Sequence, residues 1–299
     1  MAQPVETTPN LSVIHDIGYQ RYTGPRLGRA HAVQSLYVHG LRTVFGLGRG
    51  AKAKVFPWLI IGVLVLWAVI IIAIRSLAGA DAPPIVSYRG FVTSMAYPVM
   101  MFLAICAPEL VSRDLRDKVL PLYFSRPLSR IDYALTKLGT LMTAVLLLLG
   151  APQLLIFLGA VFNRKDGFSG AVSELGDMGK GLTSALVYAV VLSGLSLLIA
   201  SLSGRRAFGA AGIVAVFLIS TPIVAVLYAL GRDGLLSKLA ELANPMTATN
   251  GFLEWIFGTE ARSGISLIGD YGPVYGAALL LLVVVSVGLL LQRYRKVAS

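Results

Sequence analysis

The sequence predicts an all-α integral membrane protein with six transmembrane helices and several short helices beside them. Hydrophobic residues make up 56% of the chain and charged residues only 14%, with a mean hydropathy of +0.75. Soluble domains carry about 25% charged residues. The apolar residues gather in runs of about 20, the length that crosses a bilayer as a helix. Lys and Arg cluster at the ends of these runs, as they do in membrane proteins.

Six apolar runs define the expected spans and divide the chain. They cover about 56–77, 91–110, 138–162, 181–202, 208–230 and 273–291. Prolines and glycines inside the runs do not split them, because neighbouring helices can satisfy the freed backbone groups. We expect one membrane domain, with a tail and an amphipathic segment before it and a short tail after it. These regions are a tail at 1–29, an amphipathic helix and linker at 30–55, the membrane domain at 56–292 and a tail at 293–299.

The basic residues predict the orientation of the chain. An even number of spans places both termini on one side, and 18 of the 26 Lys and Arg residues fall on that side. Because basic loops stay inside, we expect a multi-pass protein of the cytoplasmic membrane with both termini cytoplasmic. The net charge of +11 is spread over the ends of the runs. This favours anionic membrane lipids over nucleic acid as partners.

The segment before the first span carries an apolar stripe at helical spacing. Its members are Val33, Leu36, Tyr37, Leu41, Val44 and Phe45. Because Arg49, Lys52 and Lys54 follow and the segment leads into a span, we expect a helix lying in the inner-leaflet interface. A helix packed on a soluble core is the alternative interpretation.

The loop between the second and third runs mixes both signs of charge with apolar residues. Its first charged residues are Arg113, Asp114, Arg116, Asp117 and Lys118. A short helix of this kind, with Leu115 and Leu120 among the charges, suits docking to another protein. A solvated charged loop is the alternative.

The expected outer loop at 231–272 is also rich in apolar residues. The stretch 252–257 is too apolar for a water-exposed loop and too short to span the bilayer. We therefore expect short interfacial or re-entrant helices before the sixth span.

The sequence lacks the residue patterns that several kinds of chemistry require. No phosphate-binding loop of the Walker type occurs, and Gly46–Gly50 lacks the closing glycine and the preceding strand of a dinucleotide loop. The histidines all precede the first span, and Cys106 is the single cysteine. Span centres carry no ionisable group, which argues against an ion-coupled carrier. We expect no catalytic, cofactor or metal site on this chain.

From Glu109 to Lys137 the sequence resembles the permease subunits of ATP-binding-cassette exporters of the type 2 class. The shared pattern is a glutamate at the inner end of span two, a charged helix, the element Ser125–Arg130 and a lysine opening span three. Asn244-Pro245 in the outer loop also fits. The resemblance implies a coupling helix that docks on a separate ATPase. The residues implied in docking are Glu109, Arg113, Asp114, Arg116, Asp117, Lys118, Arg126 and Arg130.

The same resemblance implies how such a subunit works. ATP and Mg would be held by the ATPase, and a second permease copy would complete a homodimer. The substrate path would run between spans two and five of both copies. The path residues in span two would be Met95, Tyr97, Met101 and Phe102. Export is the direction that this class implies.

Two other function classes remain open from the sequence. A membrane scaffold that transports nothing could dock a cytoplasmic partner on the same loop. A membrane-embedded enzyme would need a polar cavity at depth, for which Gln153 and Ser193 are the candidate residues.

Overall fold

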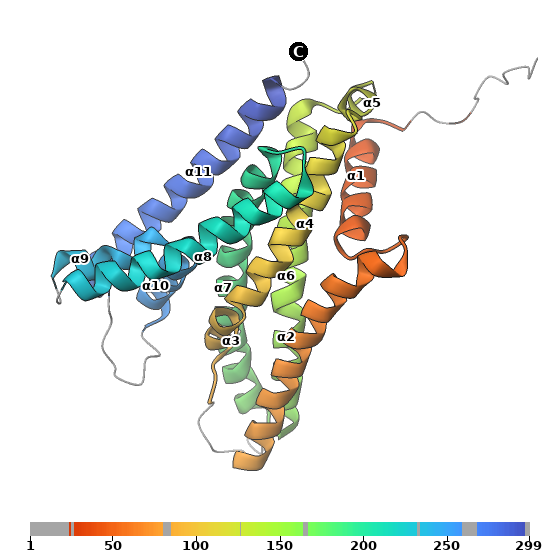
Figure 1. Cartoon of the computed structure of the whole chain (residues 1–299). Coiled ribbons are helices and arrows are strands. Elements are labelled where there is room, and N and C mark those ends of the chain that lie inside the picture. The colour runs from red at the N-terminus through yellow and green to blue at the C-terminus, as the bar shows by residue number, and fades with distance from the viewer. Residues whose placement is uncertain are drawn as a thin grey trace, which may run out of the picture.

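The computed structural model describes Gly24 and residues 27–79, 85–125, 127–163, 167–231, 234–258 and 268–296 (Figure 1). In this part of the chain every regular element is a helix, and no strand is present. The longer helices are α1 (Arg29–Val44), α2 (Ala51–Ala78), α4 (Ala96–Arg116), α6 (Arg130–Asn163), α7 (Gly167–Ser201), α8 (Arg206–Gly231), α10 (Pro245–Phe257) and α11 (Gly272–Lys296). The short ones are α3 (Tyr88–Ser94), α5 (Leu120–Phe124), α9 (Leu235–Leu239) and the 3-10 turns η1 (Ala240–Ala243) and η2 (Gly269–Tyr271).

Within the described residues, six helices are long and apolar enough to cross a membrane, as the sequence predicted. They are α2, α4, α6, α7, α8 and α11. The chain is therefore a multi-pass membrane protein by the length and composition of its helices.

The spans form a bundle with one open flank. Helices α6 and α7 pack lengthwise at its centre, α4 packs against α7 and α8, and α2 packs against α6. Figure 1 shows α8 and α11 leaning away from the bundle, joined at their far end by α9 and α10. In α4 and in α7, 67% of the most apolar 18-residue stretch is buried inside the bundle, but in α8 only 11% of that stretch is buried. Helix α8 thus presents most of its apolar surface outward.

Two spans begin earlier than hydropathy predicted. Helix α6 begins at Arg130 instead of 138 because Ser129 and Asp132 cap it reciprocally: the Asp132 N–H donates to Ser129 Oγ (3.1 Å) and the Ser129 N–H donates to Asp132 Oδ2 (3.0 Å). Helix α7 begins at Gly167 instead of 181. Its first turns bury Glu174, which has an ion-pair partner on α2. Both helices therefore contain residues that were assigned to loops.

The second expected span is two helices, which corrects the continuous run 91–110. Helix α3 ends at Ser94 and α4 begins at Ala96, with Met95 between them. Pro98 has no N–H to donate to the Ser94 carbonyl, so the helical hydrogen bonding is interrupted there. The Ser87 side chain caps the start of α3.

The expected separate charged helix at Arg113–Lys118 is also corrected. Helix α4 continues to Arg116, and the chain turns where Lys118 adopts a positive φ of 51°. The separate helix that follows is α5, which is apolar and spans Leu120–Phe124.

Helix α1 lies in the segment for which an amphipathic helix was expected, and it packs lengthwise along α6. Its Tyr37 hydroxyl donates to Thr143 Oγ1 (2.9 Å), and Gly40 meets the Thr140 side chain so closely that an added Cβ would lie 2.9 Å from it. The stripe residues Leu36 and Val44 are buried against the bundle. Contact between the other face of α1 and lipid headgroups stays a prediction.

Short helices before the last span are present as the sequence predicted. Helix α10 is capped by Asn244, whose Nδ2 also donates to the Phe217 carbonyl of α8 (2.9 Å). At its other end Arg89 of α3 donates to the Gly258 carbonyl (2.8 Å). Polar contacts thus fix α10 between α3 and α8.

Candidate functional site

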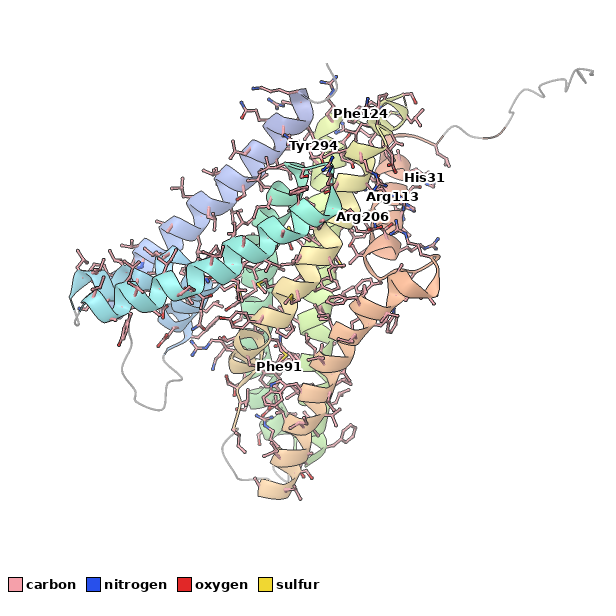
Figure 2. All side chains as sticks on the ribbon, viewed as in Figure 1. His31, Phe91, Arg113, Phe124, Arg206 and Tyr294 are labelled. Carbon is pink, nitrogen blue, oxygen red and sulfur yellow. The ribbon has the colours of Figure 1, made fainter. Side chains whose placement is uncertain are left out.

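One end of the bundle gathers the segments that the sequence placed on the same side. We call it the α5 end. It holds α5, the starts of α1, α6 and α8, and the end of α11 (Figure 1). Figure 2 shows Arg113, Arg206, Phe124 and Tyr294 at this end, away from Phe91. The Arg130 guanidinium joins two of these segments by donating to the Arg295 carbonyl (2.5 Å).

The predicted docking residues do not all face outward. Asp114 turns into the bundle, where its Oδ2 accepts from Lys137 Nζ (2.9 Å) and from the Tyr133 hydroxyl (2.6 Å). Lys137 is buried and also donates to the Leu110 carbonyl (2.9 Å). Asp114 therefore anchors the end of α4 to α6 with a side chain that is 15% exposed, and its contact with an ATPase stays a prediction.

Arg113 and Arg116 point outward from the last turn of α4. Their side chains are 46% and 54% exposed, and Asp117 lies between them at 3.6 Å and 2.9 Å. The hydrogen bond from Arg116 holds the pKa of Asp117 below its ordinary value. Lys118 is exposed on the following turn. These four residues remain available to a partner, whereas Arg126 lies outside the described residues.

Glu109, another predicted docking residue, is held between two arginines. Its carboxylate accepts from Arg49, in the turn after α1, and from Arg206 Nη1 (2.5 Å), at the start of α8. The Glu109 side chain is 15% exposed. The Glu109 carboxylate on α4 thus joins Arg49 and Arg206, which lie 157 positions apart in the sequence.

Helix α5 is held on the bundle by aromatic rings. Tyr123 and Phe124 pack on Tyr133 of α6, which in turn lies 5.2 Å from the Tyr294 ring of α11. The opposite side of α5 carries Leu122, which is 69% exposed. The result is a fixed short helix with an apolar side chain pointing away from the bundle.

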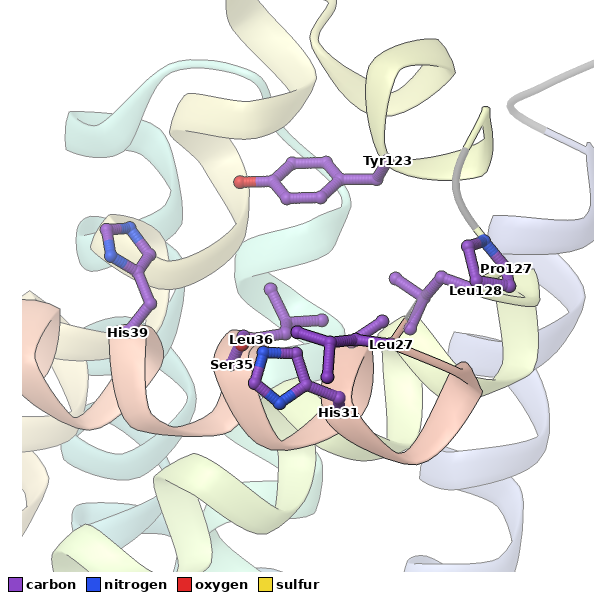
Figure 3. A pocket seen from close by; sticks show the side chains of 9 residues that line it. Leu27, His31, Ser35, Leu36, His39, Tyr123, Pro127 and Leu128 are labelled. Carbon is purple, nitrogen blue, oxygen red and sulfur yellow. The ribbon is translucent and has the colours of Figure 1, made fainter. Parts of the chain in front are cut away.

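A cavity of about 510 Å³ lies between α1 and α5 (Figure 3). Its lining residues are Leu27, His31, Ala32, Ser35, Leu36, His39, Tyr123, Pro127 and Leu128. Figure 3 shows the His31 and His39 rings on α1 and the Tyr123 ring reaching over them from α5. Burial and the charge of Lys137 lower the pKa of His39. The cavity is thus mostly apolar, with the His39 imidazole at one edge.

The four candidate path residues are divided between two environments. Tyr97 and Met101 are exposed on α4 at 48% and 43%, while Met95 and Phe102 are buried. Helix geometry explains the division: residues 97 and 101 share one face of α4, residue 102 lies on another, and Met95 lies at the break before it. A substrate path along these four residues stays a prediction. Span five does lie beside span two, since α8 packs along α4.

A buried ionic cluster at the other end of the bundle was not predicted. Glu174 accepts from Arg75 Nη1 (2.7 Å) and from the Tyr88 hydroxyl (2.8 Å), and its side chain is only 3% exposed. Burial and the bond to Glu174 raise the pKa of Tyr88. Helical spacing beyond the apolar run could have placed Glu174 on α7, but its pairing with Arg75 could not be read from the sequence.

The residues considered for an embedded enzyme are buried on α6 and α7. Gln153 Nε2 donates to the Leu149 carbonyl (3.2 Å), and Ser193 is fully buried. Within the described ranges no group of three or more His, Cys, Asp or Glu residues could hold a metal ion. The sequence matches no protein-family model and no curated protein.

Proposed function

We propose that this chain is the membrane-spanning permease subunit of an ATP-binding-cassette transporter. In this proposal ATP hydrolysis and Mg binding belong to a separate ATPase, and the permease exports a substrate across the cytoplasmic membrane. The observation that carries the proposal is the surface formed by Arg113, Arg116, Lys118 and Leu122 at the α5 end, which we call the docking surface.

The docking surface combines exposed recognition groups with internal anchors. Arg113 and Arg116 offer charged donors, and Leu122 offers an apolar side chain. Beneath them, Asp114 and Leu120 are held in the bundle. A surface fixed in this way loses little conformational freedom on binding, which favours a specific partner over plain solvation.

Helix α4 supplies a mechanical connection from this surface into the membrane. It runs without a break from Arg116 to Ala96 and packs against α7 and α8. We infer that a movement of the ATPase at the docking surface shifts α4, and that α8 moves with it because the two helices pack together. Two permease copies would face each other across these helices, with Tyr97 and Met101 bordering the substrate path.

Reversing the two outward charges tests the proposal. The Arg113→Glu/Arg116→Glu variant is expected to lose co-purification with its cognate cassette ATPase, while membrane insertion is unchanged. The matched control is Arg205→Glu/Arg295→Glu, which makes the same charge change on exposed residues of the same end. Equal co-purification of both variants with the ATPase would contradict docking at this surface.

Transport itself separates the permease from a scaffold. Vesicles containing the permease and the ATPase should accumulate a labelled substrate only with ATP, and the Arg113→Glu/Arg116→Glu variant should abolish this uptake. A complex that forms normally, yet shows substrate-independent hydrolysis and moves nothing, would favour the scaffold.

A further inference from the structure

A second cavity lies where four helices meet. It has a volume of about 450 Å³ and lies between the turn after α1, the start of α2, α4 and the start of α8. Its lining residues are Thr43, Val44, Arg49, Gly50, Ala53, Phe56, Pro57, Ile105, Cys106, Glu109, Arg113 and Arg206. It shares Arg113 with the docking surface and is otherwise separate from it.

The cavity wall is strongly positive. Three guanidinium groups line it, from Arg49, Arg113 and Arg206, against the single carboxylate of Glu109. Both oxygens of Glu109 are already engaged, by Arg49 and Arg206. Each guanidinium has five N–H donors, so most donors are left for another acceptor. Asp117, which faces Arg113 at 3.6 Å, is not part of the lining.

The glycine-rich segment after α1 shapes this cavity. Gly46 and Gly48 have positive φ values of 67° and 78°, which build the tight turn that brings Arg49 to Glu109. At Gly50 an added Cβ would meet nothing within 4 Å, so the wall is open at that position. The Gly46–Gly50 segment, whose sequence lacks the pattern of a dinucleotide loop, thus shapes the wall of this cavity.

The rest of the lining is apolar and adjoins the membrane spans. Phe56 and Pro57 belong to the first turns of the span that begins at Ala53, and Ile105 belongs to α4. The cavity therefore lies at the end of candidate spans, where lipid headgroups meet the hydrocarbon region. Basic pockets in this position are suited to acidic headgroups.

We propose that this cavity binds a phosphate group through Arg49, Arg113 and Arg206. Planar guanidinium groups donate paired hydrogen bonds to phosphate oxygens, and three of them offset the negative charge of Glu109 and of the ligand. The phosphate can come from an anionic phospholipid, whose acyl chains would lie on Phe56 and Ile105, or from a soluble phosphate. The proposal does not depend on transport or on an ATPase.

Native mass spectrometry of the purified full chain in detergent tests the proposal. The probes are phosphatidylglycerol, phosphatidylcholine and inorganic phosphate. Arg113→Gln removes one guanidinium that is not bonded to Glu109, and Arg116→Gln is the matched control outside the cavity. We expect phosphatidylglycerol to bind more tightly than phosphatidylcholine, and Arg113→Gln to weaken its binding about fivefold while Arg116→Gln leaves it unchanged.

A variant that blocks the cavity without a charge change provides a second readout. In Gly50→Leu the added Cβ meets no atom within 4 Å, so the variant should fold, and the larger side chain on the cavity lining should lower phosphate binding. Selective loss of phosphatidylglycerol in Arg113→Gln and Gly50→Leu supports a lipid as the source. Competition by inorganic phosphate, lost in the same two variants, supports a soluble phosphate. Equal binding of all probes by wild type, Arg113→Gln and Gly50→Leu would overturn the proposal.

Discussion

Asp114 and Lys137 form a largely buried ion pair at the α5 end. The side chain of Lys137 is 5% exposed, and its ammonium also donates to the Leu110 carbonyl. Removing one partner of such a pair leaves an uncompensated charge without water around it, at a cost of about 3–5 kcal/mol. Replacing both partners with apolar side chains removes that charge and costs less.

The Lys137→Met variant should therefore be clearly destabilised, by about 3 kcal/mol, while Asp114→Leu/Lys137→Met recovers much of the loss. Thermal unfolding followed by circular dichroism in detergent measures this. Arg116→Gln, on the exposed side of the same turn, serves as the control and should change stability by less than about 0.5 kcal/mol. Equal stability of the single and double variants would show that the pair is not coupled.

Residue by residue, the sequence located the charged cluster of the candidate site but not the direction of its side chains. Asp114 and Asp117 stand three positions apart on one turn, yet Asp114 points to Lys137 and Asp117 to solvent. The difference arises from α6, which brings Lys137 to α4 across 23 positions of sequence. Contacts of this kind depend on tertiary packing and cannot be derived from local spacing.

At the scale of elements, hydropathy identified the six candidate spans of the described chain but not their ends. It measures transfer into lipid, whereas α6 and α7 continue beyond the apolar runs. The start of α6 was readable, since Ser129 and Asp132 have the spacing of a capping box. The break at Met95 was readable from Pro98. The ion pair that secures the start of α7 was not readable.

The junction of η1, α10 and α11 holds a carboxyl in an unusual environment. Glu241 lies against α10 so closely that a Cβ added at Gly251 would come within 2.8 Å of its Oε2, and this oxygen has no hydrogen-bond partner. Burial, together with the charge of Glu254, raises the pKa of Glu241 from 4.5 to about 7. Tyr275 and Lys238 also face this region, but the Tyr275 hydroxyl donates to the Lys238 carbonyl.

The pH dependence of stability should reveal this carboxyl. With a raised pKa, the folded chain binds the proton more tightly than the unfolded chain, so the stabilisation is complete below pH 4.5 and is lost as the pH rises through 7. Glu241→Gln should therefore gain stability relative to wild type at pH 8, by about 1.4 kcal/mol per unit of pKa shift. Thermal unfolding at pH 5 and pH 8 checks this, with Asp177→Gln as an exposed control. A wild-type difference that Glu241→Gln leaves intact would rule out Glu241 as its source.

For the whole molecule, α8 stands out among the candidate spans because it buries the smallest share of its most apolar stretch. Ile219 and Val226 are 62% and 56% exposed, and only 11% of the most apolar 18-residue stretch of α8 is buried within the chain. Lipid alone could cover the outward face of α8. The proposed permease, however, requires a second copy across α4 and α8, so this face should be an interface between copies.

Disulfide cross-linking in membranes tests that arrangement. Cys106 is the single cysteine and is buried, so Cys106→Ser provides a cysteine-free background. In it, Ile219→Cys or Val226→Cys should give a covalent dimer on mild oxidation, because equivalent residues near a two-fold axis approach one another. Leu66→Cys on α2, which is 60% exposed, is the control and should stay monomeric. Cross-linking through Leu66→Cys but not through either α8 position would place the second copy on the opposite flank and contradict a path between α4 and α8.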